Sequence, residues 1–277
     1  MLGLVGRAGA DTIRPLRLMT PDNLELAATY YPVSTNSAAA VVLLNSFGKA
    51  QDEWGTVPIL FQRNGIAVLT FDFRGHGDSK RRLTANGVET VDYQKFTPQD
   101  YKSLLIDVNQ AYDWLASQPG IDKHRIALIG SNIGAILALR YAAVNDDVAG
   151  LILLSPGLAF HDLRTDDAIA GFRLRPLRIV ASREDAFAND SAKRLIEMRQ
   201  HAGQAVESNE LILCTGNLHG AAMLTGVPDL SSVVFAWLDR VLSGEPRPVP
   251  PPAPPGSVPA TNKPAASPQR VERNYHS

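Results

Sequence analysis

The stretch GSNIG, read as Gly130-Ser131-Asn132-Ile133-Gly134, stands between a run of apolar residues and a long helix-forming segment. This order predicts a sharp turn from a buried strand into a helix. Such a turn needs small residues two places before and two places after its apex, because longer side chains would collide inside it. With Asn132 at the apex those places hold the two glycines, whereas with Ser131 they hold two isoleucines. The spacing therefore puts Asn132 at the apex, although a plain helix start capped by Asn132 fits these five residues alone equally well.

Short apolar runs alternate with helical stretches along most of the chain. Runs that are apolar on both faces are typical of central parallel strands covered by helices, so the alternation predicts one doubly wound α/β domain with a mostly parallel sheet. The first two β-rich runs, joined by turn residues, predict an antiparallel hairpin. The predicted strands are Ile13–Met19, Leu24–Tyr31, Val41–Leu44, Ala67–Phe71, Ile126–Ile129, Leu151–Leu154, Ile179–Ala181 and Leu211–Leu213. The predicted helices are Glu53–Arg63, Pro98–Ser117, Ile133–Val144, Ser191–His201 and Leu230–Leu242.

The composition narrows the kinds of partner. The 27 basic residues nearly balance the 28 acidic ones, so the chain has no basic field with which to hold nucleic acid. The single cysteine, Cys214, excludes an internal disulfide framework and suggests a buried strand thiol. No apolar run approaches the roughly 20 residues of a membrane span, and the start lacks the apolar region of a signal peptide. We therefore expect a cytoplasmic protein whose partner is a small molecule or another protein.

The two ends differ in kind from the middle of the chain. We expect a flexible N-terminus over residues 1–12, one α/β domain over residues 13–244 and a disordered tail over residues 245–277. This last segment holds ten of the 19 prolines and hardly any large apolar residue, so it cannot bury a core. An inert tail and a ligand for a proline-recognising protein domain both fit this composition.

Four segments follow one another along the chain, and the second of them contains the predicted turn. They are FDFRGHGDS (Phe71–Ser79), IALIGSNIGAILALRYAA (Ile126–Ala143), IVASREDAFAN (Ile179–Asn189) and GNLHGAAML (Gly216–Leu224). In these segments the chain from Leu24 to Leu242 resembles the α/β-hydrolase superfamily, in particular its small-lidded esterases and its dienelactone-hydrolase-like and serine-aminopeptidase-like members. The second segment is similar to the superfamily's nucleophile elbow in everything but the nucleophile, since Asn132 stands at the apex.

The resemblance implies the order nucleophile, acid, histidine along the chain. These positions fall on Asn132, Asp185 and His219, each just beyond a predicted strand, where ligands bind in open α/β sheets. By the resemblance, His219 is the general base and Asp185 is the carboxylate that orients it. Glu184 is a neighbouring rival of Asp185 for the acid position.

The resemblance also implies an oxyanion hole made of two backbone N–H groups, those of Phe47 and Ile133. Members of the superfamily often read His-Gly or His-x-x-Gly in the first of these loops, whereas this chain reads Asn45-Ser46-Phe47-Gly48. Backbone donors survive a change of side chain, so the hole can persist. Asn45 and Ser46 nevertheless bring two uncharged polar groups beside the predicted site.

An amide at the apex changes the chemistry that the site can perform. A carboxamide is not a useful nucleophile at neutral pH, so the ordinary acyl-enzyme route is closed. Four hypotheses follow: a degenerate hydrolase that only binds a small acyl compound or a partner; a hydrolase in which His219 activates water directly; deamidation of Asn132 to an aspartate nucleophile, slowed by the bulky Ile133; and recruitment of Ser46 as a substitute nucleophile.

The remaining features concern the substrate. Only about twenty residues, Pro156–Pro176, separate two predicted strands, which is too short for a large helical lid. An open pocket for small or extended acyl groups follows, with the candidate lining residues Phe47, Leu158, Phe160 and Phe187. We find no metal-ligand cluster, Walker loop or dinucleotide fingerprint, and so expect no metal and no cofactor. The sequence thus predicts a protein derived from serine-type ester or amide hydrolases, with a non-catalytic binding or regulatory role as the alternative.

Overall fold

The computed structural model describes residues 12–201 and 209–243. Within these residues ten strands form one mixed sheet in the order β12-β11-β8-β7-β3-β4-β2-β5-β6, with β1 paired to the other side of β2. The strands from β12 to β4 are parallel, and β1, β2, β5 and β6 add an antiparallel extension. The strands are β1 Arg14–Met19, β2 Leu24–Tyr31, β3 Ala38–Leu44, β4 Ala67–Phe71, β5 Arg81–Thr84, β6 Gly87–Thr90, β7 Ile121–Ser131, β8 Val148–Leu154, β11 Leu177–Ser182 and β12 Asn209–Cys214.

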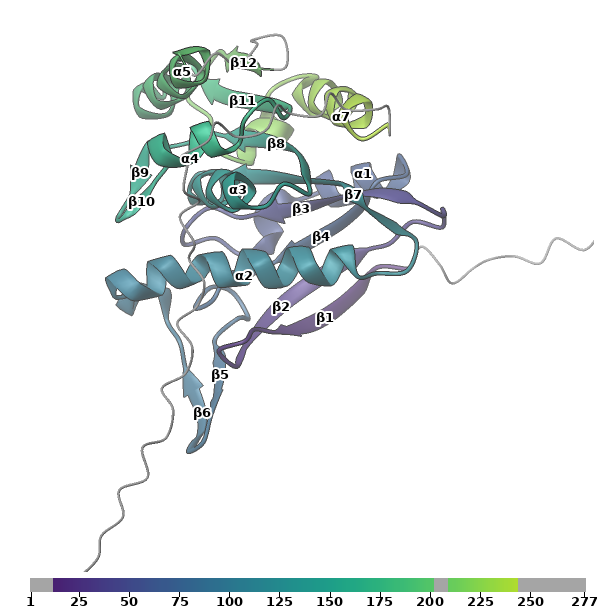
Figure 1. Ribbon diagram of the computed structural model, residues 1–277, viewed down its shortest axis with the longest axis vertical. Coiled ribbons are helices and arrows are strands. Elements are labelled where there is room, and N and C mark those ends of the chain that lie inside the picture. The colour runs from purple at the N-terminus through teal and green to yellow at the C-terminus, as the bar shows by residue number, and fades with distance from the viewer. Residues whose placement is uncertain (1–11, 202–208, 244–277) are drawn as a thin grey trace, which may run out of the picture.

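Helices cover both faces of the sheet, as Figure 1 shows. Side chains of α2, α3 and α5 join one buried cluster, and side chains of α1, α6 and α7 join the other. The helices are α1 Val57–Arg63, α2 Pro98–Ala116, α3 Ile133–Val144, α4 Asp166–Gly171, α5 Ala186–His201, α6 Ala222–Gly226 and α7 Leu230–Val241, with the short 3-10 helices η1 Gln51–Trp54 and η2 Tyr93–Lys95. The predicted α/β fold with a mostly parallel, doubly wound sheet is therefore confirmed.

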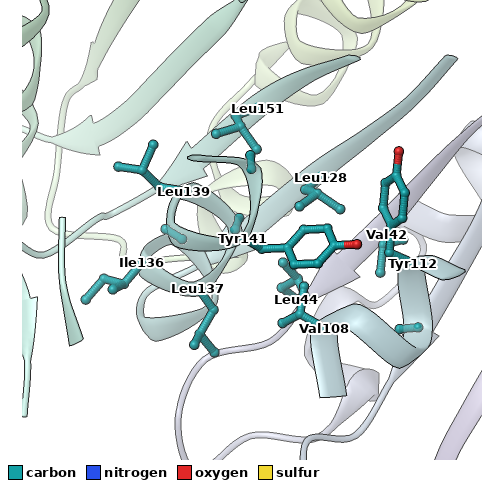
Figure 2. Close-up of a cluster of buried hydrophobic side chains, with 14 of the residues drawn as sticks. Val42, Leu44, Val108, Tyr112, Leu128, Ile136, Leu137, Leu139, Tyr141 and Leu151 are labelled. Atoms are coloured by element: carbon teal, nitrogen blue, oxygen red, sulfur yellow. The ribbon is translucent and has the colours of Figure 1, made fainter. Parts of the chain in front are cut away.

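The central strand β3 explains why both faces must be covered. Its side chains alternate between the two clusters, with Val42 and Leu44 on the side of α2 and α3, and Val41 and Leu43 on the side of α1 and α7. All four are fully buried, which follows from the period of two along a strand. Figure 2 shows Val42 and Leu44 among the side chains that α2, α3 and neighbouring strands contribute to the first cluster.

Most predicted elements lie where the sequence placed them, and the differences have clear causes. The helix α3 begins and ends at the predicted residues, while α5 begins five residues earlier than predicted because only Ala188 of its first turn is buried, which leaves no apolar face to mark the helix start. The predicted helix Glu53–Arg63 is split into η1 and α1 by Gly55, whose φ is 51°. The hairpin of β5 and β6 was not predicted, since its exposed and mixed sequence lacks a buried face.

The segment between β8 and β11 is short, as predicted for a minimal lid. It holds a small hairpin, β9 Ala159–Phe160 and β10 Leu163–Arg164, followed by α4. Cys214 is buried at the end of β12, as expected. No helix in the described part of the chain is long and apolar enough to cross a membrane. The predicted flexible N-terminus, apart from its last residue, and the predicted Pro-rich tail lie outside the described residues.

Candidate active site

The turn at GSNIG is the sharp strand-to-helix connection that the glycine spacing predicts. Strand β7 ends at Ser131, helix α3 begins at Ile133, and Asn132 between them has φ 53° and ψ −112°. A residue with a side chain adopts this conformation at a cost of about 1–3 kcal/mol, and such outliers gather at functional sites. A Cβ atom on Gly130 would collide with the backbone of Gly134, and one on Gly134 would collide with the carbonyl group of Leu44. Gly130 is therefore required where β7 approaches α3, and Gly134 is required where α3 approaches the end of β3.

The structure brings the three predicted triad positions together. The Asn132 Nδ2 atom lies 2.8 Å from His219 Nε2, and His219 Nδ1 lies 2.5 Å from Asp185 Oδ2. The amide N–H donates to Nε2, so the neutral imidazole carries its proton on Nδ1 and donates it to the carboxylate. The second oxygen of Asp185 accepts from the backbone N–H of Ala188, 3.1 Å away, which fixes the carboxylate at the start of α5.

The rival acid, Glu184, has no part in this arrangement. Its side chain is exposed, whereas the side chain of Asp185 is 15% exposed and that of His219 is 40% exposed. Asp185 follows β11 and His219 follows β12, so two neighbouring parallel strands end beside the elbow and deliver both side chains to it. The catalytic roles of these residues stay predictions, while their geometry matches the order that the sequence suggested.

Ser131 points away from this trio and into the protein. It is fully buried, its Oγ accepts from the backbone N–H of Ala221 at 2.8 Å, and it lies 2.7 Å from Ser46 Oγ. A hydroxyl engaged in this way behind the elbow has no hydrogen bond to His219. The geometry agrees with the choice of Asn132 as the apex.

The carboxylate of Glu53 links the loop after β3 to the elbow. Glu53 Oε1 accepts from Ser46 Oγ at 2.6 Å and from Ser131 Oγ at 3.1 Å, while Oε2 accepts from the backbone N–H of Ser46 at 2.7 Å. The sequence pattern predicts Glu53 at the start of a helix, and nothing in its immediate sequence marks it as part of the site. The Ser46 hydroxyl faces this carboxylate, so the structure gives no support to Ser46 as a substitute nucleophile activated by His219.

Asn45 does not face the site, contrary to the expectation from the sequence. It is fully buried, its Nδ2 donates to the Phe71 carbonyl at 2.8 Å, and its Oδ1 accepts from Trp54 Nε1 at 2.7 Å. The side chain thus ties β3 to β4 and to η1. Asn45 lies directly after the end of β3, between buried neighbours, and this position explains its role as a structural link.

An open cavity of about 720 Å³ lies over the elbow. It is lined by Ser46, Phe47, Gly48, Lys49, Ala50, Asp52, Glu53, Asn132, His219 and Ala222. Of the four predicted apolar lining residues, only Phe47 lies in this wall. Phe160 instead packs against the Phe47 ring with 5.2 Å between the ring centroids, Leu158 packs on the buried cluster, and Phe187 is 63% exposed. The cavity is therefore more polar than expected, because η1 and the loop before it form its wall.

The fold is that of the α/β-hydrolase superfamily. The family model described as serine aminopeptidase, S33, matches residues 35–219, and the chain belongs to that family. An uncharacterised protein of Mycobacterium tuberculosis is 29% identical over 54% of this chain and 46% of its own length. The thiohydrolase AneE of Aspergillus aculeatus is 27% identical over 62% of this chain and 51% of its own length. The chain thus matches about half the length of these curated relatives.

Solved structures share the fold at low sequence identity. The α/β-hydrolase GrgF of a Penicillium species superposes with a TM-score of 0.68 at 15% identity, covering 84% of this chain and 99% of that one. The esterase Pf2001 of Pyrococcus furiosus superposes with a TM-score of 0.65 at 18% identity, covering 83% and 91%. These structures show that the chain shares the fold of an α/β-hydrolase and of an esterase.

Proposed function

We propose that this protein binds a small ester or thioester in the open cavity, with Asn132 at the position of the missing serine nucleophile. The observation that carries the proposal is the chain of hydrogen bonds from Asn132 through His219 to Asp185. A serine hydroxyl at the same place would meet His219 Nε2, the atom that takes the proton in this class of site. The similarity to AneE, a thiohydrolase, supports the choice of an ester or thioester as ligand.

The amide limits what the site can do. It offers no nucleophile, so hydrolysis requires a water molecule that His219 activates directly, and His219 Nε2 must first release the Asn132 amide. The backbone N–H groups of Phe47 and Ile133 are our candidates for stabilising the oxyanion. Sites that lose the nucleophile still accelerate hydrolysis roughly 10³–10⁴-fold over the reaction in water. We expect the wild type to accelerate ester hydrolysis by no more than this factor.

A serine-directed fluorophosphonate probe tests the position of Asn132 without knowledge of the substrate. We expect no labelling of the wild type and covalent labelling of Asn132→Ser at residue 132, located by peptide mass spectrometry. The matched control is Asn132→Ser combined with His219→Ala, which keeps the hydroxyl but removes the base and is expected to lose labelling. Failure of Asn132→Ser to react, with folding confirmed by circular dichroism, would contradict our assignment of the site.

A purely binding protein is the second candidate, and the occupied Nε2 atom of His219 favours it. Assays of the wild type with p-nitrophenyl esters and an acyl thioester distinguish slow hydrolysis from binding without turnover. Turnover that His219→Ala abolishes supports hydrolysis by activated water. Binding of a non-hydrolysable ester analogue, followed by calorimetry, together with no turnover, supports a binding protein.

A further inference from the structure

Asn132 is held in the backbone conformation that closes a five-membered ring with its own chain. The ring joins the side-chain Cγ to the backbone N of Ile133, so Cβ and that N must be eclipsed about the Cα–C bond. In an L-residue Cβ lies about 120° from the backbone N about that bond, so the required ψ is near −120°, and the observed ψ of −112° is within roughly 10° of it. From this geometry we propose that Asn132 is a site of self-catalysed deamidation in the folded protein.

The attacking nitrogen is available. Ile133 is the first residue of α3, and the first N–H groups of a helix have no acceptor within the helix. In a flexible chain a bulky residue after asparagine slows ring closure, because it hinders the rotation that brings the two atoms together. The elbow has already fixed this rotation, since Gly130 and Gly134 hold β7 and α3 against each other. Positioning of two reacting groups in this way raises reaction rates strongly.

The leaving group is also placed beside a proton carrier. The Asn132 Nδ2 atom lies 2.8 Å from His219 Nε2, and Asp185 stabilises the charged form of the ring through Nδ1. The Ile133 N–Cγ bond forms as Ile133 N loses its proton to water in the open cavity, which passes the proton to His219 Nε2 once that atom has released the amide N–H. The Cγ–Nδ2 bond breaks as His219 returns a proton to Nδ2, and ammonia leaves.

Water then opens the cyclic imide. Its oxygen adds to Cγ and its proton returns to Ile133 N, which leaves aspartate at residue 132; opening at the other carbonyl gives the isoaspartyl isomer. The overall change is one amide and one water converted into one carboxylic acid and one ammonia. Asn132 lines the open cavity, so water reaches it. No partner or cofactor enters the reaction.

The experiment compares one asparagine with another in the same molecule. The wild type is incubated folded and, separately, unfolded in guanidinium chloride, both in water enriched in heavy oxygen, and is then digested with trypsin. Deamidation adds about one dalton plus the label from water. Peptide Ile126–Arg140 reports Asn132, and peptide Leu83–Lys95 reports Asn86, an ordinary asparagine followed by glycine in the β5–β6 turn.

We expect Asn132 to convert at least about tenfold faster in the folded protein than in the unfolded one. Asn86 should convert at least as fast after unfolding as before, which makes it the matched control. A rate for Asn132 in the folded state that is equal to or below that in the unfolded state would overturn the proposal. His219→Ala should slow the folded-state conversion, and an unchanged rate would overturn the role of His219. Both readouts are peptide masses, so they are independent of whether the protein hydrolyses an ester.

Discussion

Two polar clusters lie at the carboxyl ends of the parallel strands β4 and β7, on either side of β3, and they differ in how completely they are closed. Beyond β4, Arg74 donates to Asp107 from both its backbone N–H and its guanidinium, at 2.7–2.9 Å, and to Asp22 at 2.8 Å. The side chains of Arg74 and Asp107 are fully buried. Beyond β7, the Asn132, His219 and Asp185 cluster opens into the cavity.

The comparison separates polar groups that hold the fold from polar groups available to a ligand. A buried charge is tolerated only when it is paired and hydrogen-bonded, and Arg74 meets this condition entirely within the protein. His219 has partners on both ring nitrogens, yet 40% of its side chain is exposed. The first cluster should therefore control stability, and the second should control reactivity with little effect on stability.

The largest effect is expected when the open cluster is broken in a protein that carries a nucleophile. In the Asn132→Ser background, Asp185→Asn should reduce the rate of fluorophosphonate labelling by about 10³–10⁴-fold, because the imidazole loses its orienting carboxylate. The free energy of unfolding should change by less than about 1 kcal/mol, since the pair is partly exposed. Glu184→Gln is the matched control, and an equal loss of labelling there would contradict the assignment of Asp185.

Breaking the closed cluster of Arg74, Asp107 and Asp22 should mainly reduce the stability of the protein. Asp107→Ala leaves the buried Arg74 guanidinium without its main partner, and we expect a loss of about 3–5 kcal/mol in the free energy of unfolding. Urea denaturation measures it. Asp22→Ala should cost less, because the Asp22 side chain is 35% exposed. An equal loss in the free energy of unfolding for Asp107→Ala and Asp22→Ala would contradict the idea that burial sets the contribution of each carboxylate.

The glycines at the elbow, Gly130 and Gly134, affect stability although they lie beside the reactive cluster. Gly134→Ala should destabilise the protein by about 3 kcal/mol, because the added Cβ collides with the Leu44 carbonyl, a backbone group that cannot rotate away. Gly65→Ala, where nothing surrounds the added Cβ, should cost only about 1–2 kcal/mol for its positive φ of 84°. Thermal denaturation compares the two, and an equal cost would show that the elbow yields more readily than its geometry indicates.

The smallest effect concerns His76, which packs behind the Phe47 loop. Burial lowers the pKa of His76, and the hydrogen bond to the Arg74 carbonyl only partly offsets this. A lowered pKa in the folded state means that His76 favours folding at pH values above its unfolded pKa of about 6.5, and that this contribution is lost as the pH falls. We expect His76→Gln to flatten the decline of stability between pH 7 and pH 5, by at most about 1.4 kcal/mol per pH unit. An identical pH profile in the variant would contradict this.

Much of the fold followed from local patterns because those patterns report burial directly. The apolar runs of β3, β4 and β8 and the face of α2 could be located from residue type alone, and so could the elbow. The β5–β6 hairpin could not be located in this way, because an exposed antiparallel hairpin has no buried face and therefore no apolar pattern. The split between η1 and α1 could not be located from the pattern, because the apolar spacing continues across Gly55 and only its positive φ ends the first helix.

The sequence by itself placed Asn132 at the apex, because the crowding that demands Gly130 and Gly134 acts over five residues and the accompanying segments favour the elbow over a plain helix start. It also supplied Asp185 and His219 through the order of the loops. Only the tertiary structure decided that Glu53 joins Ser46 to Ser131, that Asn45 turns inward, and that the cavity wall is polar. The physical reason is distance along the chain: the partners of Ser131 and Asn45 lie on other elements, and a hydrogen bond between elements leaves no periodic trace in the sequence.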